Sequence, residues 1–185
     1  MKNLKLLPFL LLLLTLACSP KPDLTKITKE FYQAMEAHDH SKITSFYSDS
    51  VRVMGKGYRS VYTKAAYKDW VEWDGFFEPT YEILSLTESD NYVEAQIRKS
   101  DPRILFLNGE PFITTERLNF VDGKLQSLEI LEEQYNEARW IETRELLVNW
   151  ITENHPELEG FIFDQTLEGA ENYGHAIKLY EVRRK

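Results

Sequence analysis

Hydrophobic residues recur at intervals of three and four in the first part of the chain, a spacing that predicts amphipathic helices. In residues 24–37, Leu24, Ile27 and Phe31 fall on one side, and Asp23 is placed to cap the first turn. The elements expected up to residue 77 are a helix at 24–37, a break at 38–41, a short helix around 43–47, a β-rich stretch at 50–57 and a helix at 63–77.

After Pro79 the apolar residues alternate with polar ones, which predicts strands. Asn-Gly at 108–109 and Asp-Gly at 122–123 are hairpin signals. The expected elements are strands at 81–87, 92–99, 103–107, 112–121 and 124–131, followed by helices at 136–154 and 166–181. Because helices precede a run of strands, the predicted fold class is α+β, with a C-terminal two-helix extension over residues 134–185.

The last predicted hairpin places two acidic residues opposite each other. If its turn has two residues, Glu116 pairs with Glu129. Directly opposed side chains have Cβ atoms about 5 Å apart, and in a partly dry cavity one of two such carboxyls tends to keep its proton. A pair of this kind suits general acid–base chemistry. The pair is structural instead if its face points outward, if the register shifts, or if Arg98 or Arg103 neutralises it.

The N-terminus has the pattern of a targeting segment. Lys2 and Lys5 precede an apolar run at residues 6–17, which is shorter than the roughly 20 residues that a membrane-spanning helix needs and fits a signal peptide. Cys18, the single cysteine, follows directly. The segment resembles a bacterial lipoprotein signal.

That resemblance implies cleavage after residue 17, acylation of Cys18, a tether over residues 18–23 and, because Ser19 follows the cysteine, attachment to the outer membrane. Membrane contact through the acylated cysteine is therefore expected. The alternative is a secreted protein with one free thiol.

Charge and composition exclude some functions. The chain has 185 residues, a length that predicts one domain with a hydrophobic core. It has 30 acidic against 22 basic side chains. The acidic balance argues against nucleic-acid binding. The chain has no Gly-rich phosphate loop, and His38 and His40 have no third ligand nearby. We therefore expect no cofactor and no metal.

Two stretches resemble the nuclear transport factor 2-like superfamily, which includes the SnoaL-like cyclases and ketosteroid isomerase. They are FYQAMEAHDHSKITSFYSDSVRVMGKG at 31–57 and LNFVDGKLQSLEI at 118–130, within a resemblance that covers residues 24–133. The resemblance implies a cone-shaped, strongly curved antiparallel sheet packed on the N-terminal helices, with a pocket between them. The oxyanion-hole phenol of the isomerase falls on Phe31, or on Tyr32 after a slip of one residue, and its base falls on Gly55. Isomerase chemistry of that type is therefore not expected.

Six residues are expected to line the pocket: Phe31, Tyr32, Trp70, Glu116, Leu118 and Glu129. Three functions remain open. The favoured one is a lipid-anchored, non-catalytic envelope domain that binds a small amphipathic ligand or an envelope partner. The second is a cyclase, isomerase or dehydratase that uses Glu116 and Glu129. The third is a structural or assembly subunit, for example a homodimer, whose interface is formed by the C-terminal helices.

Overall fold

The computed structural model describes residues 21–183, so the predicted leader and Cys18 lie outside the described residues. Its helices are α1 (Leu24–Glu36), α2 (His40–Ser45), α3 (Lys64–Gly75), α4 (Pro102–Asn108), α5 (Glu137–Asn154) and α6 (Leu167–Val182), with a short 3₁₀ turn at Pro156–Leu158. Its strands are β1 (Ser50–Gly55), β2 (Tyr58–Thr63), β3 (Thr80–Glu88), β4 (Tyr92–Ser100), β5 (Phe112–Val121) and β6 (Lys124–Gln134). None of the described helices has the length and apolar character needed to cross a membrane.

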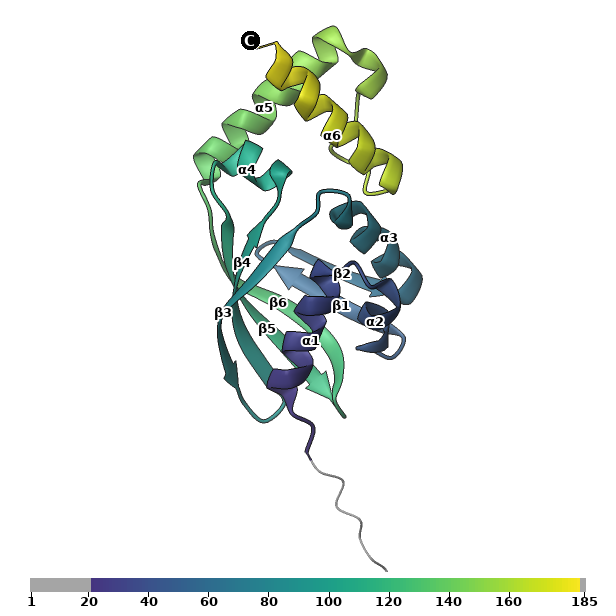
Figure 1. Ribbon diagram of the computed structural model, residues 1–185, viewed down its shortest axis with the longest axis vertical. Helices are drawn as coiled ribbons and strands as arrows, with labels where there is room; N and C mark the ends of the chain where they lie inside the picture. The colour runs from purple at the N-terminus through teal and green to yellow at the C-terminus, as the bar shows by residue number, and fades with distance from the viewer. Residues whose placement is uncertain (1–20, 184–185) are drawn as a thin grey trace, which may run out of the picture.

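The six strands form one curved sheet in the order β2-β1-β6-β5-β4-β3, and this confirms the α+β class (Figure 1). Four of the pairings are antiparallel, and the pairing of β1 with β6 is parallel. The sheet is therefore mixed at the point where the N-terminal hairpin joins it. Its strong curvature gives the cone-like shape that the resemblance implied, but the sheet is not antiparallel throughout as expected, because β1 joins β6 in parallel.

The main core lies between helix α1 and the inner face of the sheet. Asp23 caps α1 as expected, since its carboxylate accepts a 2.8 Å hydrogen bond from the Lys26 amide. The spacing of apolar residues along α1 turns Phe31 inward, where it belongs to the same buried cluster as Val93 and Leu118 of the sheet. This arrangement fixes α1 over the sheet and leaves room beside it for a cavity.

A second core holds the C-terminal extension in place. Leu147 and Ile151 of α5 and Tyr173 of α6 are buried with Trp73 of α3 and Leu107 of α4. Figure 1 shows α5 and α6 crossing each other beyond one end of the sheet. The extension is thus packed against the domain, whereas its role as an interface with a partner stays a prediction.

Two expected elements differ from the structure. Residues 103–107, predicted as a strand, lie in helix α4. Asp101 caps this helix, Pro102 occupies its first turn, and Gly109 ends it with a φ of 86°, so Asn108-Gly109 is a helix terminus and not a hairpin turn. The predicted β-rich stretch continues beyond its glycines into a second strand, β2, which forms a hairpin with β1.

Candidate functional site

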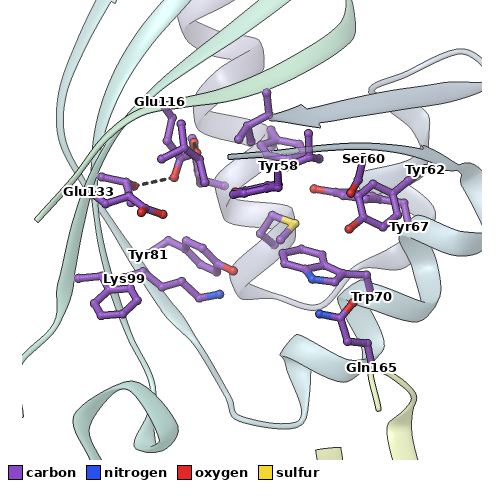
Figure 2. Close-up of a pocket in the computed structure, with 18 residues that line it drawn as sticks. Tyr58, Ser60, Tyr62, Tyr67, Trp70, Tyr81, Lys99, Glu116, Glu133 and Gln165 are labelled. Atoms are coloured by element: carbon purple, nitrogen blue, oxygen red, sulfur yellow. Dashed lines mark hydrogen bonds between the residues drawn. The ribbon is translucent and has the colours of Figure 1, made fainter. Parts of the chain in front are cut away.

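A cavity of about 460 Å³ opens between α1, α3 and the inner face of the sheet (Figure 2). Its volume lies within the roughly 300–1,000 Å³ typical of small-molecule sites. The side chains that line it are mostly aromatic or aliphatic, with a few polar groups among them: Phe31, Tyr32, Met35, Val53, Tyr58, Ser60, Tyr62, Tyr67, Trp70, Tyr81, Lys99, Phe112, Thr114, Glu116, Leu128, Ile130, Glu133 and Gln165.

Glu116 is held in this cavity by two hydroxyl groups. Tyr32 of α1 donates a 2.6 Å hydrogen bond to Glu116 Oε2, and Thr114 of the same strand donates one of 2.6 Å to Oε1. Burial raises the pKa of Glu116, and the nearby charge of Glu133 raises it further. The two hydroxyl bonds and Lys99 oppose this effect, but the net direction is upward. Glu116 is therefore a positioned carboxyl that takes up a proton more readily than a solvated glutamate.

Glu129 does not join Glu116 in the cavity, and the predicted pairing of the two is wrong. The β5–β6 hairpin follows the expected register only as far as Phe120 and Leu125, after which a bulge shifts it by one residue. Glu116 consequently lies opposite Ile130, and Glu129 lies opposite Arg117 on the other face. Because neighbouring residues of a strand point to opposite faces, a one-residue shift is enough to exchange them.

Glu133 is the second acidic residue of the cavity. A second register shift, between Thr115 and Glu116, places Glu133 opposite Thr114 on the inner face. Glu133 is exposed, and it contributes to the raised pKa of Glu116. Figure 2 shows both carboxylates on the same side of the cavity. The structure therefore has a pair of acids here, with a different second member from the one that the sequence predicted.

A buried charged cluster lies next to the cavity. Asp74 of α3 is 2% exposed, and its oxygens lie 2.6 and 2.7 Å from Lys99 Nζ. Tyr81 donates a 2.9 Å bond to Asp74 Oδ2, and Arg103 Nη2 lies 3.6 Å from Oδ1. Burial alone would raise the pKa of Asp74, but the positive charges of Lys99 and Arg103 outweigh it, so this pKa is lowered.

Arg103 also pairs with Asp101 at 3.2 Å, and Arg98 pairs with Glu82. Both arginines therefore have acidic partners other than Glu116 and Glu129, and neither neutralises the acids of the predicted pair.

Aromatic rings form the wall opposite the acids. Tyr67 and Trp70 stack with ring centroids 5.5 Å apart, and Tyr62 packs on Tyr67 edge to face at 5.7 Å. Burial raises the pKa of Tyr58 to about 12, so its phenol stays neutral at physiological pH. Gln165, just before α6, also lines the cavity, and so the C-terminal extension contributes directly to the site.

Of the six residues predicted to line the pocket, Phe31, Tyr32, Trp70 and Glu116 do so. Leu118, which is fully buried, belongs to the core, and Glu129 lies on the other face of the sheet. The tyrosines of β2 and β3, together with Lys99, Glu133 and Gln165, also line the cavity and were not predicted from the sequence. The alternation Tyr58, Ser60, Tyr62 signals one face of a strand and could have revealed part of this set.

His38 and His40 lie at the junction of α1 and α2 and do not line the cavity. Within residues 21–183, no three His, Cys, Asp or Glu side chains are grouped in a way that could hold a metal ion.

Comparison with solved structures identifies the fold. A Shewanella putrefaciens protein classed as a SnoaL-like polyketide cyclase matches with a TM-score of 0.51 and 13% identity, over 68% of this chain and 87% of that one. An NTF2-like protein of unknown function from Cytophaga hutchinsonii matches with a TM-score of 0.50 and 12% identity, over 64% and 94% of the two chains. A Kribbella flavida protein classed as a ketosteroid isomerase matches with a TM-score of 0.50 and 10% identity, over 62% and 78%.

No family model matches the sequence, and no curated protein matches it significantly. The structural likeness nevertheless confirms the predicted domain: the chain is an α+β protein with the nuclear transport factor 2-like fold, of the kind seen in SnoaL-like proteins. At these identities the comparison establishes the fold, and the chemistry has to be argued from the cavity itself.

Proposed function

We propose that this protein is a lipid-anchored envelope domain that binds a small amphipathic molecule in its cone-shaped cavity without transforming it. The observation that carries the proposal is the cavity of about 460 Å³, in which aromatic walls surround a few polar groups. Such a lining favours a ligand with an apolar body and a polar end, because the rings bury the body while the carboxyls, hydroxyls and amide orient the end.

Binding can be tested with a neutral amphipathic dye, Nile red, and with a variant that fills the cavity. Ser60 lines the cavity, whereas its neighbour Val61 is 61% exposed outside it. We expect one saturable site in the wild-type protein. Ser60→Phe should weaken binding at least about tenfold, a change of about 1.4 kcal/mol, and the matched control Val61→Phe should retain it. Dye binding that is unaffected by Ser60→Phe would contradict the proposal.

The anchor is a separate part of the proposal. Its support is the sequence around Cys18, which lies outside the described residues. Triacylation would hold the domain at a membrane surface, since each buried methylene contributes about 0.8 kcal/mol. In cell fractionation, Cys18→Ala should move the protein from the outer-membrane fraction to the soluble fraction, and Ser19→Ala should leave it attached to a membrane. Unchanged fractionation of Cys18→Ala would exclude the anchor.

A second candidate is catalysis of the cyclase, isomerase or dehydratase type. The observation that favours it is the Glu116 carboxyl, which has a raised pKa and a hydrogen bond from the Tyr32 phenol, because such a group can exchange a proton with a bound molecule. The test is deuterium exchange next to the carbonyl of a bound aryl methyl ketone in heavy water. Exchange faster than in buffer, and abolished by Glu116→Gln, would support catalysis. A rate equal to that in buffer would favour the binding role.

A further inference from the structure

The charges that line the cavity are not balanced. Its ionisable groups, apart from the phenols, are Lys99, Glu116 and Glu133. No basic side chain of residues 21–183 forms an ion pair with Glu116 or Glu133. The two acids therefore face the cavity without a positive partner from the described part of the chain.

Lys99 offsets the negative charge of the two acids only in part: it opposes the rise of the Glu116 pKa, but the net direction is still upward. Both oxygens of Asp74 accept hydrogen bonds from its ammonium group, at 2.6 and 2.7 Å. Asp74 is itself buried, so moving Lys99 toward Glu116 would leave a buried carboxylate without its closest partner, which is costly. Lys99 and Arg103 together balance Asp74 and Asp101, so the cluster as a whole is neutral, and Lys99 is its one member that lines the cavity.

The opposite wall has the surface that attracts cations. The faces of Tyr, Trp and Phe rings carry partial negative charge and bind ammonium groups. Trp70 and Tyr67 stack beside the cavity, and Tyr58 and Tyr62 project from β2 into it. Figure 2 shows Tyr62, Tyr67 and Trp70 across from the two glutamates, with Tyr58 between the two sides. An ammonium group placed between the walls would meet carboxylates on one side and aromatic rings on the other.

We infer that the ligand of this cavity is an organic cation, an amine or quaternary ammonium group on an apolar body, held by Glu116 and Glu133 against the aromatic wall. This inference rests on the proposed binding function and adds the charge of the ligand to it. The apolar body would lie along Phe31, Met35 and Ile130, which line the remainder of the cavity.

The protonation of Glu116 supports this assignment. Burial and the charge of Glu133 raise the pKa of Glu116 in the free protein. A bound cation would lower it again, because a nearby positive charge favours the ionised carboxyl. Binding should therefore release protons from the protein over the pH range in which Glu116 is partly protonated.

The experiment uses three probes with one ring system and different charges: naphthylethylamine, naphthylethanol and naphthylacetate. Titration calorimetry with the full-length protein at pH 7 should give an affinity for the amine at least about tenfold higher than that for the alcohol, and the acid should bind more weakly than either. In a second series, run across the pH range in which Glu116 is partly protonated, the binding heat of the amine should depend on the ionisation enthalpy of the buffer, as proton release requires.

Variants then locate the effect. Glu133→Gln and Glu116→Gln should each bring the ratio of amine to alcohol affinity closer to one. Glu129→Gln is the matched control: it lies on the same strand as Glu133 but faces Arg117 outside the cavity, and it should keep the wild-type ratio.

The outcomes separate the two proposals. Equal affinities for amine and alcohol, or a preference for the acid, would overturn the cation inference while leaving the proposed binding function in place. Failure of all three probes together with Nile red would overturn both. A preference for the amine that survives in Glu116→Gln and Glu133→Gln would show that these acids are not its cause, and would overturn the assignment.

Discussion

The hydroxyl of Tyr32 donates a 2.6 Å hydrogen bond to Glu116 Oε2, joining helix α1 to strand β5 across residues that are 84 positions apart in the chain. This bond stabilises the ionised carboxyl and opposes the effect of burial on the pKa of Glu116. Tyr32→Phe should therefore raise the pKa of Glu116 further, as measured by carbon-13 NMR titration of its carboxyl. Tyr62→Phe, in the same cavity, is the control. An unchanged or lower pKa in Tyr32→Phe would contradict the predicted role of the bond.

The raised pKa of Glu116 predicts a pH dependence of stability. A carboxyl with a higher pKa in the folded state than in the unfolded chain binds its proton more tightly when folded, so its contribution to stability decreases as the pH rises above its ordinary value of 4.5. Glu116→Gln lacks this titration. The unfolding free energy of the variant relative to wild type should thus increase between pH 4 and pH 8 in urea experiments.

The control for this pH series is Glu129→Gln. The difference in unfolding free energy between this variant and wild type should change much less with pH. If the relative stability of Glu116→Gln is constant over the whole range, the pKa of Glu116 is not raised by folding.

The buried position of Asp74 predicts a large loss of stability when it is removed. Asp74→Ala leaves Lys99 without its closest acidic partner and Tyr81 without an acceptor, and breaking a buried ion pair typically costs about 3–5 kcal/mol. Urea unfolding should show a loss of this size. Glu82→Ala, which removes the partner of Arg98 at an exposed site, should cost less than about 1 kcal/mol. Similar losses in the two variants would contradict the prediction.

The same carboxylate predicts sensitivity to acid. Its pKa is lower in the folded protein than the ordinary value of 3.8, so its contribution to stability is complete above that value and disappears as the pH falls through the folded-state pKa. The loss caused by Asp74→Ala should therefore shrink in strong acid. A loss that stays constant down to pH 2 would show that Asp74 does not titrate with folding.

The second core predicts different effects for two adjacent leucines of α5. Leu147 is fully buried, whereas Leu146 is 50% exposed. Leu147→Ala should lower the unfolding free energy by about 2–5 kcal/mol, because it leaves a cavity in a packed core, and Leu146→Ala should change it by about 0.5 kcal/mol or less. Equal effects of the two substitutions would mean that α5 does not pack as described.

Much of the fold could be predicted from the sequence because the helices and strands have clear apolar periodicities. The error at residues 103–107 has a local cause. A short apolar run fits a buried strand as well as a helix face, and the decisive signals lie at its ends, where Asp101 caps the helix and Gly109 terminates it with a positive φ. Asn108-Gly109 predicts a hairpin turn as readily as a helix end, because Asn-Gly is common in both settings.

The candidate site was only partly predictable. Glu116 could be identified because it lies on the inward face of a regular strand, and Tyr32 because the resemblance to ketosteroid isomerase places a phenol there after a slip of one residue. The second acid, Glu133, could not be identified, because its orientation depends on two register shifts that no short sequence motif predicts. One shift turns Glu129 outward, and the other brings Glu133 in. Gln165 could not be predicted either, since its place in the cavity depends on how the extension folds back toward Trp70.

The described chain begins at the end of the molecule farthest from its last two helices. Lys21 lies 3.5 Å from Asp90 in the β3–β4 loop, and Pro22 lies against the β5–β6 turn near Gly123, whereas α5 and α6 sit beyond the opposite end of the sheet (Figure 1). A membrane tether ahead of Lys21 would hold these two hairpin turns close to the membrane surface. Helices α5 and α6 would then lie farthest from that surface, where other molecules in solution would reach them first.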